Sequence, residues 1–596
     1  MNAEKAIPAR PRSTLLFAAV VAASTAGTTA PALAAPATVE EVIVTATPIR
    51  NSQAAALAAK RAAVNVSDVI SADTIGRFPD QNLADSLGRV PGIAIERDQG
   101  QARYINFRGS PFRYTKIAFD GIDVLGAENG RIPRFDSFPS SITSQIEVNK
   151  AITADMPGES VTGFVNIKTF NPFDQAGFRI AAEAGMGNQE LGDEEIDRQN
   201  LRLSYSNDTF GILGFYSHNR RGRITDNREY GYEVTPEGLI PSVDDLDFRS
   251  YRGAREDNAW GGEIEFRPDD TTRFFFSTLY SEFIDEEERN AFEVQFDELA
   301  GAGVELTPTT GYFPEVPVVR NLEDGLYENS TFTNTLGTDF RIGVWDLEAR
   351  LNYTETENFT DFPFPQSLGA VVGASYDLTD PLLPDVRVFE PNTMNPVDIN
   401  ELDFPVTLGI YFRTGIDTDA VKFRFDAGRD IDFLGDSRIE FGVQYDTREA
   451  EGFTGVIFPL FPSEIDIDDF VTDEPWDTTF PNTIGGRNVD NIGLQAAWEQ
   501  ANGGAIDVPN NPDDDIVIDE DVFAAYVMNT TVFDWGNVNY GARVEYTDAT
   551  SSGQVLDDET GTTSPVAVDK QYFNVLPSVH VNWDLREDLK LRASLS

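Results

Sequence analysis

The segment WDLEARLNY, residues 345–353, alternates apolar and polar side chains along its whole length. In a β-strand, Trp345 and Leu347 would share one face, while Asp346 and Glu348 would share the other. The same alternation recurs in RIEFGVQYD (438–446), VNYGARVEY (538–546) and LKLRASL (589–595). The polar faces carry Arg and Glu, as a water-filled lumen would require, and the apolar faces often end in aromatics. The pattern favours transmembrane strands, although a strand of a soluble β-sandwich also alternates.

The spacing of the turns distinguishes these two classes of protein. From Phe178 onward, about every second connection between predicted strands is a tight polar turn, and the others are long. The tight turns are predicted at 206–210, 267–272, 341–345, 429–437, 534–537 and 584–588, and the long connections at 219–257, 284–329, 359–417 and 450–519. Short periplasmic turns and long outer loops produce this pattern. We therefore predict an antiparallel transmembrane β-barrel over residues 173–596, with about thirteen strands present.

The first 34 residues have the three parts of a secretory signal peptide. Lys5, Arg10 and Arg12 give a positive start, LLFAAVVAA (15–23) gives an apolar stretch, and the small residues ALA at 32–34 give a cleavage site. We predict that residues 1–34 are removed on export. No later run of about 18 apolar residues is present, so helical membrane spans are not expected.

The composition excludes several other classes of protein. The chain contains no cysteine, so disulfides cannot hold an exported protein of this length together. Its 99 acidic residues outnumber 46 basic residues, which gives a net charge of −53 and disfavours nucleic acid and anionic membrane surfaces as partners. Only His218 and His580 are histidines, so a histidine-based catalytic or zinc site is not expected. His580 alternates to the lumen side of its predicted strand.

Residues 61–172 differ from the strands that follow them. FPDQNLADSLGRVPG (78–92) predicts a turn, a short helix and a Pro-Gly stop. Strand signals follow in YINFRGS (104–110), TKIAFDGIDV (115–124) and ITSQIEVNKA (142–151). These features predict a small α+β domain ahead of the barrel.

The order of motifs in this domain resembles the plug of TonB-dependent outer-membrane receptors, in the proteobacterial group whose plugs open with an FPDQN-type motif. The motifs are FPDQN, SLGRVPG, RDQGQARYINFRG, FDGID, SQIEVNKAITADMPGESVTGFVNIKT and NPFD. The resemblance implies that residues 61–172 fill the barrel as a plug. The plug-motif residues that it implies are Arg108, Gly109, Asp120, Gly121, Gly158, Gly163 and Asn166. The chain departs from the family in reading Thr162-Gly163-Phe164 where paired small glycines usually precede the VNIKT strand.

The strand-forming segment VEEVIVTATPIR, residues 39–50, has no partner strand nearby. It matches the TonB box of the family in position and type, and residues 35–60 would form this box and a linker. An unpaired strand can be added to the sheet edge of a partner through main-chain hydrogen bonds. The residues expected to bind TonB are Glu41, Val42, Ile43, Val44 and Thr45. Residues 51–63 would serve as a tether or a marginal helix.

The resemblance implies import driven by the TonB complex of the inner membrane, with no enzymatic step and no cofactor. Many members of the group are associated with carbohydrate uptake, so an oligosaccharide is the expected solute. A ferric siderophore is the alternative, although the negative charge of the chain would tend to repel an anionic chelate. A passive porin is disfavoured, because it would need neither a plug nor a TonB box.

The long connections carry aromatic residues beside carboxylates, in FPFP (362–365), FTGVIFPLFP (453–462) and EPWD (474–477). Aromatic faces and acidic acceptors suit sugar rings, although the loops could instead pack on one another. The candidate ligand-binding residues are Phe362, Phe364, Phe458, Phe461 and Trp476. The acidic runs at 463–470 and 512–521 lack the Gly and Glu spacing of a calcium loop, and we predict no metal site.

The size of the plug bears on the number of strands. A plug of about 120 residues would be roughly 35 Å across. Fourteen strands would leave a lumen of only about 20 Å, whereas twenty-two would leave about 38 Å. An open edge in lipid would also leave backbone groups unpaired. We therefore expect that about 13 of 22 strands are present, with about nine lying beyond Ser596.

Overall fold

The computed structural model describes residues 53–596 except for the internal positions 76–81, 127–133, 236–237, 297–304, 308, 368, 381–382, 384, 460–464, 477–483, 558–561 and 587. The predicted signal peptide and TonB box lie outside the described residues. None of the described helices is long and apolar enough to cross a membrane.

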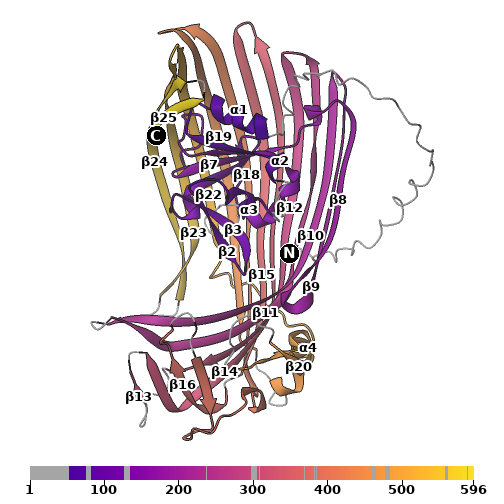
Figure 1. The fold of residues 1–596 in the computed structure, drawn as a ribbon, viewed down its shortest axis with the longest axis vertical. Helices are drawn as coiled ribbons and strands as arrows, with labels where there is room; N and C mark the ends of the chain where they lie inside the picture. The colour runs from indigo at the N-terminus through magenta and orange to yellow at the C-terminus, as the bar shows by residue number, and fades with distance from the viewer. Residues whose placement is uncertain are drawn as a thin grey trace, which may run out of the picture. The chain divides into compact units, whose positions relative to one another are not determined.

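Thirteen antiparallel strands form the continuous path of one large sheet, in which each strand pairs with the next one on the path, and three short strands from the connections join the sheet at the side (Figure 1). The strands are β8 (Gly177–Gln189), β9 (Glu194–Ser206), β10 (Phe210–Thr235), β11 (Gly238–Asp269), β12 (Thr272–Val294), β14 (Thr310–Ile342), β15 (Trp345–Ser367), β18 (Val406–Asp432), β19 (Asp436–Ile457), β22 (Ile516–Phe533), β23 (Gly536–Asp557), β24 (Thr562–Arg586) and β25 (Leu589–Leu595). Among the described residues, β8 and β25 are the two ends of this sheet. The predicted number of strands and their antiparallel pairing are confirmed.

The two faces of the large sheet differ as the alternation predicts. Leu351 and Val443 are exposed on the outward face, where lipid would surround a membrane protein. Asn352 and Lys422 are buried on the opposite face, and His580 is fully buried there with Nε2 3.2 Å from the carbonyl oxygen of Ile152. We call the face that carries these three residues the inner wall.

The six tight turns lie where the sequence predicts them, but the predicted lengths of the long connections are wrong. Between β10 and β11, for example, pairing continues to Thr235↔Gly238, where a connection over 219–257 was expected. In the sequence, the alternation of apolar residues on the outward face stops near Asn219 and Asp257. That point reflects where lipid contact would end, whereas backbone hydrogen bonds continue the ladder beyond it.

Residues before β8 form a smaller α+β unit, which we call the plug. Its five-stranded sheet has the order β1-β6-β7-β4-β5, and β2 pairs with β3 in a separate hairpin. The strands are β1 (Ser67–Ser71), β2 (Ile93–Asp98), β3 (Gln101–Phe107), β4 (Thr115–Phe119), β5 (Ile122–Asp123), β6 (Thr143–Asn149) and β7 (Gly163–Thr169). The helices are α1 (Gln53–Ala62), α2 (Ala72–Ile75), α3 (Leu83–Leu87), η1 (Phe112–Tyr114), η2 (Phe135–Ser137), η3 (Ser140–Ile142) and η4 (Pro172–Asp174).

Local sequence features explain the shape of the plug. The side chain of Asn82, the last residue of the FPDQN motif, accepts a hydrogen bond from the backbone N–H of Asp85 at 3.2 Å and caps α3. Asp120 and Gly121 both have positive φ, 49° and 88°, and make the tight turn between β4 and β5. At Gly163 an added Cβ would lie 2.5 Å from the ring of the buried Phe107, so only glycine allows this close approach.

Three connections of the large sheet, β12–β14, β15–β18 and β19–β22, fold together into what we call the outer lobe. Its elements are β13 (Glu305–Leu306), β16 (Val371–Asp377), β17 (Asp385–Phe389), η6 (Ile399–Glu401), η7 (Ile467–Phe470), β20 (Val471–Pro475), β21 (Arg487–Val489) and α4 (Asn491–Ala501). The remaining short helix, η5 (Leu191–Asp193), joins β8 to β9. The buried residues Phe296, Tyr376, Phe404 and Trp498 belong to one apolar core, so the three connections are packed as one unit.

Candidate functional site

One side of the plug is held to the inner wall by buried ion pairs around Lys422. This lysine of β18 contacts the carboxylate of Asp123 in β5 and lies 3.3 Å from a carboxylate oxygen of Asp446 in β19. All three residues are less than a tenth exposed. Removing one partner from a buried ion pair leaves an uncompensated charge, which is strongly destabilising. These contacts therefore fix β5 against β18 and β19.

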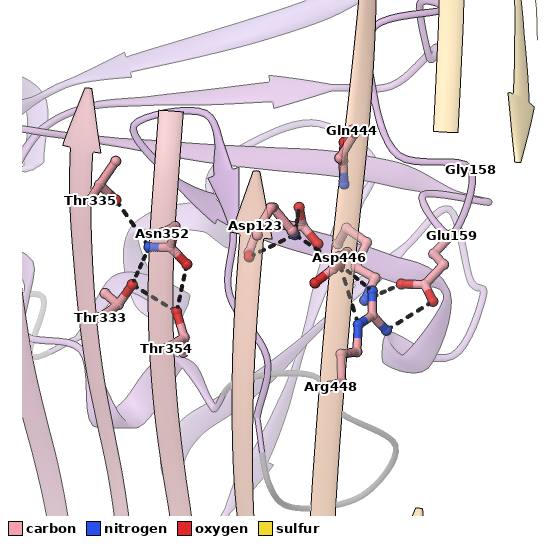
Figure 2. A network of polar contacts seen from close by, with 12 residues as sticks. Asp123, Gly158, Glu159, Thr333, Thr335, Asn352, Thr354, Gln444, Asp446 and Arg448 are labelled. Atoms are coloured by element: carbon pink, nitrogen blue, oxygen red, sulfur yellow. Dashed lines mark hydrogen bonds and ion pairs between the residues drawn. The ribbon is translucent and has the colours of Figure 1, made fainter. Parts of the chain in front are cut away.

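Arg448 of β19 extends this anchor to a second part of the plug (Figure 2). Its guanidinium lies 3.3 Å from Glu159 of the plug, 2.8 Å from Asp446 and 2.9 Å from Glu520 of β22. Lys116 of β4 also ion-pairs with Glu159. One arginine thus joins the plug loop before β7 to two neighbouring strands of the inner wall.

The charges around Asp123 lower its pKa. Burial alone would raise the pKa of this carboxyl, but the attraction of Lys422, followed by that of Lys116 and Arg448, outweighs burial and lowers the pKa to about 2. Asp123 therefore stays ionised at neutral pH, as the ion pair with Lys422 requires.

A second anchor lies on the strands at the other side of the plug. Arg255 of β11 contacts Asp98 of the plug at 2.8 Å and Asp285 of β12 at 2.8 Å. Its guanidinium also donates a hydrogen bond to Gln101 Oε1 at 3.1 Å. Ser141 of the plug donates a hydrogen bond to Ser217 of β10 at 3.1 Å. The plug is thus bound to the inner wall on both sides of β14 and β15.

The predicted plug-motif residues are distributed through the plug rather than gathered in one site. The backbone N–H of Gly121 donates to Asn166 Oδ1 at 2.9 Å, and Asp120 accepts hydrogen bonds from Thr169 at 2.7 and 3.1 Å. Gly158 donates its N–H to Glu545 of β23 at 3.0 Å. Arg108 and Gly109, with φ of 50° and 80°, form the turn after β3. Their roles in this structure are to shape the plug and seat it.

Two of the predicted ligand-binding residues lie together on β15. The rings of Phe362 and Phe364 are stacked with centroids 5.6 Å apart, and both side chains are half-buried. The pairing of β15 with β18 is in unbroken register through these residues, so they share a face with Asn352. Phe362 lies about 33 Å along the strand from Asn352, at about 3.3 Å per residue. The pair therefore lies on the inner-wall face of β15, toward the outer lobe.

Side chains from two other strands complete this aromatic cluster. The guanidinium of Arg289 in β12 lies 5.9 Å and 5.0 Å from the rings of Phe362 and Phe364, within the range of a cation–π interaction. Tyr327 of β14 meets Phe362 edge to face at 6.5 Å. Glu323 pairs with Arg289 at 3.0 Å and accepts a hydrogen bond from the Tyr327 hydroxyl at 2.6 Å. The cluster offers apolar ring faces beside charged and hydroxyl groups.

Sequence reasoning missed Arg289, Tyr327 and Glu323. They come from separate strands and contact the phenylalanines only through the pairing of β12, β14 and β15. The alternation of β12 and β14 could have placed them on the inner-wall face, but not opposite Phe362.

The other predicted ligand-binding residues do not join the cluster. Phe458 is exposed beyond the end of β19. Trp476 is only 8% exposed and packs against Phe292 in the core of the outer lobe, with ring centroids 5.4 Å apart. Phe461 lies outside the described residues. Among the described residues, no group of three or more acidic, histidine or cysteine side chains is arranged to hold a metal ion.

Two family models match the chain. The model described as TonB-dependent Receptor Plug Domain matches residues 59–164, and the model described as TonB dependent receptor-like, beta-barrel matches residues 387–596. Together they cover more than half of the chain, and they match the plug and the large sheet in the order seen here. A plug anchored to the inner wall of an antiparallel sheet defines the class of plugged transmembrane β-barrels. The chain belongs to the TonB-dependent receptors, β-barrel proteins of the outer membrane that perform TonB-dependent transport.

The similar solved structures are distant. A mutant ferric enterobactin receptor, PfeA of Pseudomonas aeruginosa, bound to enterobactin, is 10% identical over 89% of this chain and 93% of its own, with a TM-score of 0.30. The siderophore receptor PirA of Acinetobacter baumannii is 10% identical over 89% and 93%, with a TM-score of 0.28. The copper transporter OprC is 12% identical over 89% and 79%, with a TM-score of 0.29. Curated protein sequences give no match. The family assignment therefore rests on the two family models.

Proposed function

We propose that this TonB-dependent receptor imports a carbohydrate and that the solute binds at the cluster of Phe362, Phe364, Arg289, Tyr327 and Glu323. The stacked pair of half-buried phenylalanines on the inner-wall face is the observation that supports this proposal. Sugar rings have apolar C–H faces that pack on aromatic rings and hydroxyls that bond to charged and hydroxyl groups. The cluster offers both kinds of group within one surface.

The alternative solute is a ferric siderophore. A carboxylate-rich chain with a net charge of −53 tends to repel an anionic chelate and leaves a neutral sugar unaffected. Arg289 is the cationic group of the cluster, and its pairing with Glu323 offsets its attraction for an anion. The charge balance of the cluster therefore favours the neutral solute.

Equilibrium binding tests the class of solute. The full-length receptor is titrated with a panel of oligosaccharides and with ferric siderophores. We expect saturable binding of at least one oligosaccharide, and tight binding of the siderophores alone would contradict the proposal.

Substitution of the stacked pair tests its location. Phe364→Ala should raise the Kd for that oligosaccharide about 2- to 12-fold, because an aromatic contact contributes about 0.5–1.5 kcal/mol beyond the area it buries. Phe458→Ala, which removes an exposed phenylalanine outside the cluster, is the matched control and should leave the Kd unchanged. Equal effects of the two substitutions would place the site elsewhere.

We propose that Glu41, Val42, Ile43, Val44 and Thr45 couple the receptor to TonB. A β-branched segment just ahead of the plug suits strand addition to the sheet of the TonB C-terminal domain. The proposed division of the chain is a signal peptide at 1–34, the TonB box and linker at 35–60, the plug at 61–172 and the barrel strands at 173–596. Within the linker the structure forms α1, whose end contacts β25 through a hydrogen bond from Arg592 to the carbonyl oxygen of Lys60 at 2.7 Å. A pull on the TonB box would thus reach the plug through α1.

A further inference from the structure

The thirteen strands of the large sheet do not hold the plug equally. On one side, plug side chains are bound by Arg255 of β11 and by Ser217 of β10. On the other side, ion pairs join the plug to Lys422 of β18 and to Arg448 of β19. A backbone N–H of the plug also donates a hydrogen bond to Glu545 of β23. The strands β14 and β15 lie between these two anchors in the sheet.

On β14 and β15, the polar side chains that face the plug bond to one another instead (Figure 2). Asn352 donates hydrogen bonds to the hydroxyls of Thr333 at 2.9 Å and Thr335 at 3.0 Å. Thr354 donates to Asn352 Oδ1 at 3.0 Å, and the hydroxyls of Thr333 and Thr354 lie 2.8 Å apart. We call these four residues the hydroxyl ladder. Its hydrogen bonds lie within the wall, so they do not depend on the position of the plug.

The plug presents apolar side chains to the hydroxyl ladder. Phe119, Ile122 and Val124 of the plug line a small cavity of about 30 Å³ together with Thr333 and Asn352. All three of these plug side chains are buried. The plug side of this contact is therefore mostly apolar, and its two polar residues, Asp120 and Thr169, are hydrogen-bonded to each other. The wall side is lined by hydroxyl groups.

A much larger cavity begins next to this contact. It has a volume of about 750 Å³ and is lined on the plug side by Glu147 and Lys168 and on the wall side by Glu348 and Arg350. Ile122 lines both cavities, so they are neighbours. The larger cavity already separates part of the plug sheet from the wall.

We propose that the solute passes between Phe119 of the plug strand β4 and the hydroxyl ladder of β14 and β15; this proposal rests on the transport function proposed above. Parting the plug from the wall at Lys422 or Arg448 would leave buried charges without partners. Parting Phe119 from the hydroxyl ladder breaks only apolar contact, leaves Asp123 paired with Lys422 and keeps every ladder hydrogen bond in place. This stretch therefore opens at a lower cost than the two anchors on either side of it, directly beside a cavity that is already open.

The lining of this passage also bears on the class of solute. The ladder consists of three threonine hydroxyls and one carboxamide, all uncharged. Hydroxyls rotate freely and both donate and accept hydrogen bonds, so they can exchange partners with the hydroxyls of a moving sugar. The passage therefore suits a neutral, polyhydroxylated solute.

Thiol labelling of single-cysteine variants tests the position of the passage, because the natural chain contains no cysteine. Thr333→Cys places a thiol in the ladder, and Ser217→Cys places one at the anchored contact with Ser141. Both positions are buried, and both substitutions exchange a hydroxyl for a thiol. Labelling by a small membrane-impermeant maleimide is measured in whole cells with and without an energised TonB complex, in the presence of a solute that the same cells take up.

We expect energisation to accelerate labelling of Thr333→Cys at least tenfold and to leave labelling of Ser217→Cys unchanged. Thr335 is a half-buried residue of the ladder, and Thr335→Cys should show the same acceleration as Thr333→Cys. If Thr333→Cys folds poorly, Thr335→Cys takes its place in the test. Equal acceleration at Ser217, or no acceleration at the ladder while uptake continues, would overturn the proposed passage. The solute used is one that the cells are measured to take up. If this solute is not a sugar, the proposed function is contradicted, but the labelling still tests the position of the passage.

Discussion

Lys422 is the residue on which the ion pairs of β5 most depend, because it neutralises Asp123 and Asp446 together. Replacing it by Lys422→Met would leave both carboxylates buried, one of them beside Arg448. We expect the free energy of local opening of plug residues 115–125 to fall by about 3–5 kcal/mol. Hydrogen–deuterium exchange of this segment in the purified receptor measures the change.

Two further variants separate the loss of the ion pair from a general effect of losing a lysine. Lys570→Met removes an exposed lysine of β24 and should change the opening free energy by less than about 0.5 kcal/mol. Adding Asp123→Asn to Lys422→Met removes the orphaned charge and should restore part of the loss. Exchange rates that stay the same in Lys422→Met would show that the ion pair does not hold β5.

Acid should release the same part of the plug. The folded pKa of Asp123 is lowered from 3.8 to about 2, so its carboxylate stabilises the folded state above pH 3.8, and this contribution is lost as pH falls toward 2. Lys422, Lys116, Arg448 and Asp446 are the charged groups that surround it. Protection factors of residues 115–125, corrected for the intrinsic exchange rate, should drop between pH 4 and pH 2. Asp123→Asn should lose less protection over this range, and an equal loss would assign the acid effect to another group.

At the scale of elements, the strands were predictable because each tight turn interrupts an alternation with period two. Ser206 and Phe210 mark such a turn, and they are the observed end of β9 and start of β10. The outer ends were not predictable, because Asn219 and Asp257 looked like loop residues although they pair with each other in the ladder. Backbone pairing needs no apolar side chain once the strands are held together below.

The candidate site was only partly predictable for a related reason. FPFP could be singled out by its composition, and Phe362 and Phe364 do form a stacked pair. Trp476 had the same composition around it, yet it packs inside the outer lobe. Exposed and buried aromatics in long connections look alike in sequence, because what covers them comes from another connection.

Helix α4 should control the packing of the whole outer lobe. Its Trp498 is fully buried and packs against Tyr411 of β18, with ring centroids 6.3 Å apart. Trp498→Ala should destabilise the outer lobe by about 3–5 kcal/mol. A protease should then cleave the β15–β18 connection at residues 371–405 as readily as the β19–β22 connection at residues 484–515. Ile492→Ala changes an exposed residue of the same helix and should have little effect. Cleavage confined to 484–515 in Trp498→Ala would show that the connections fold separately.

Taken as a whole molecule, the receptor separates the groups proposed to bind solute from the groups proposed to receive force. The aromatic cluster lies on the inner-wall face toward the outer lobe, while the proposed TonB box precedes α1 in the sequence. The two anchors around Lys422 and Arg255 leave the hydroxyl ladder between them. Binding and transport should therefore respond to different substitutions.

Val44→Pro tests this separation at the proposed TonB box. Proline removes a backbone donor and restricts the residue before it, so strand addition to TonB should fail and energised uptake should be lost. Val44→Thr keeps the β-branched shape and every main-chain hydrogen bond, so it should transport nearly as well as the natural chain. Equilibrium binding of solute should be the same in both variants, because the aromatic cluster does not include the box. Uptake and binding are measured on cells with equal amounts of each variant; unchanged uptake in Val44→Pro would show that residues 41–45 act only as a linker.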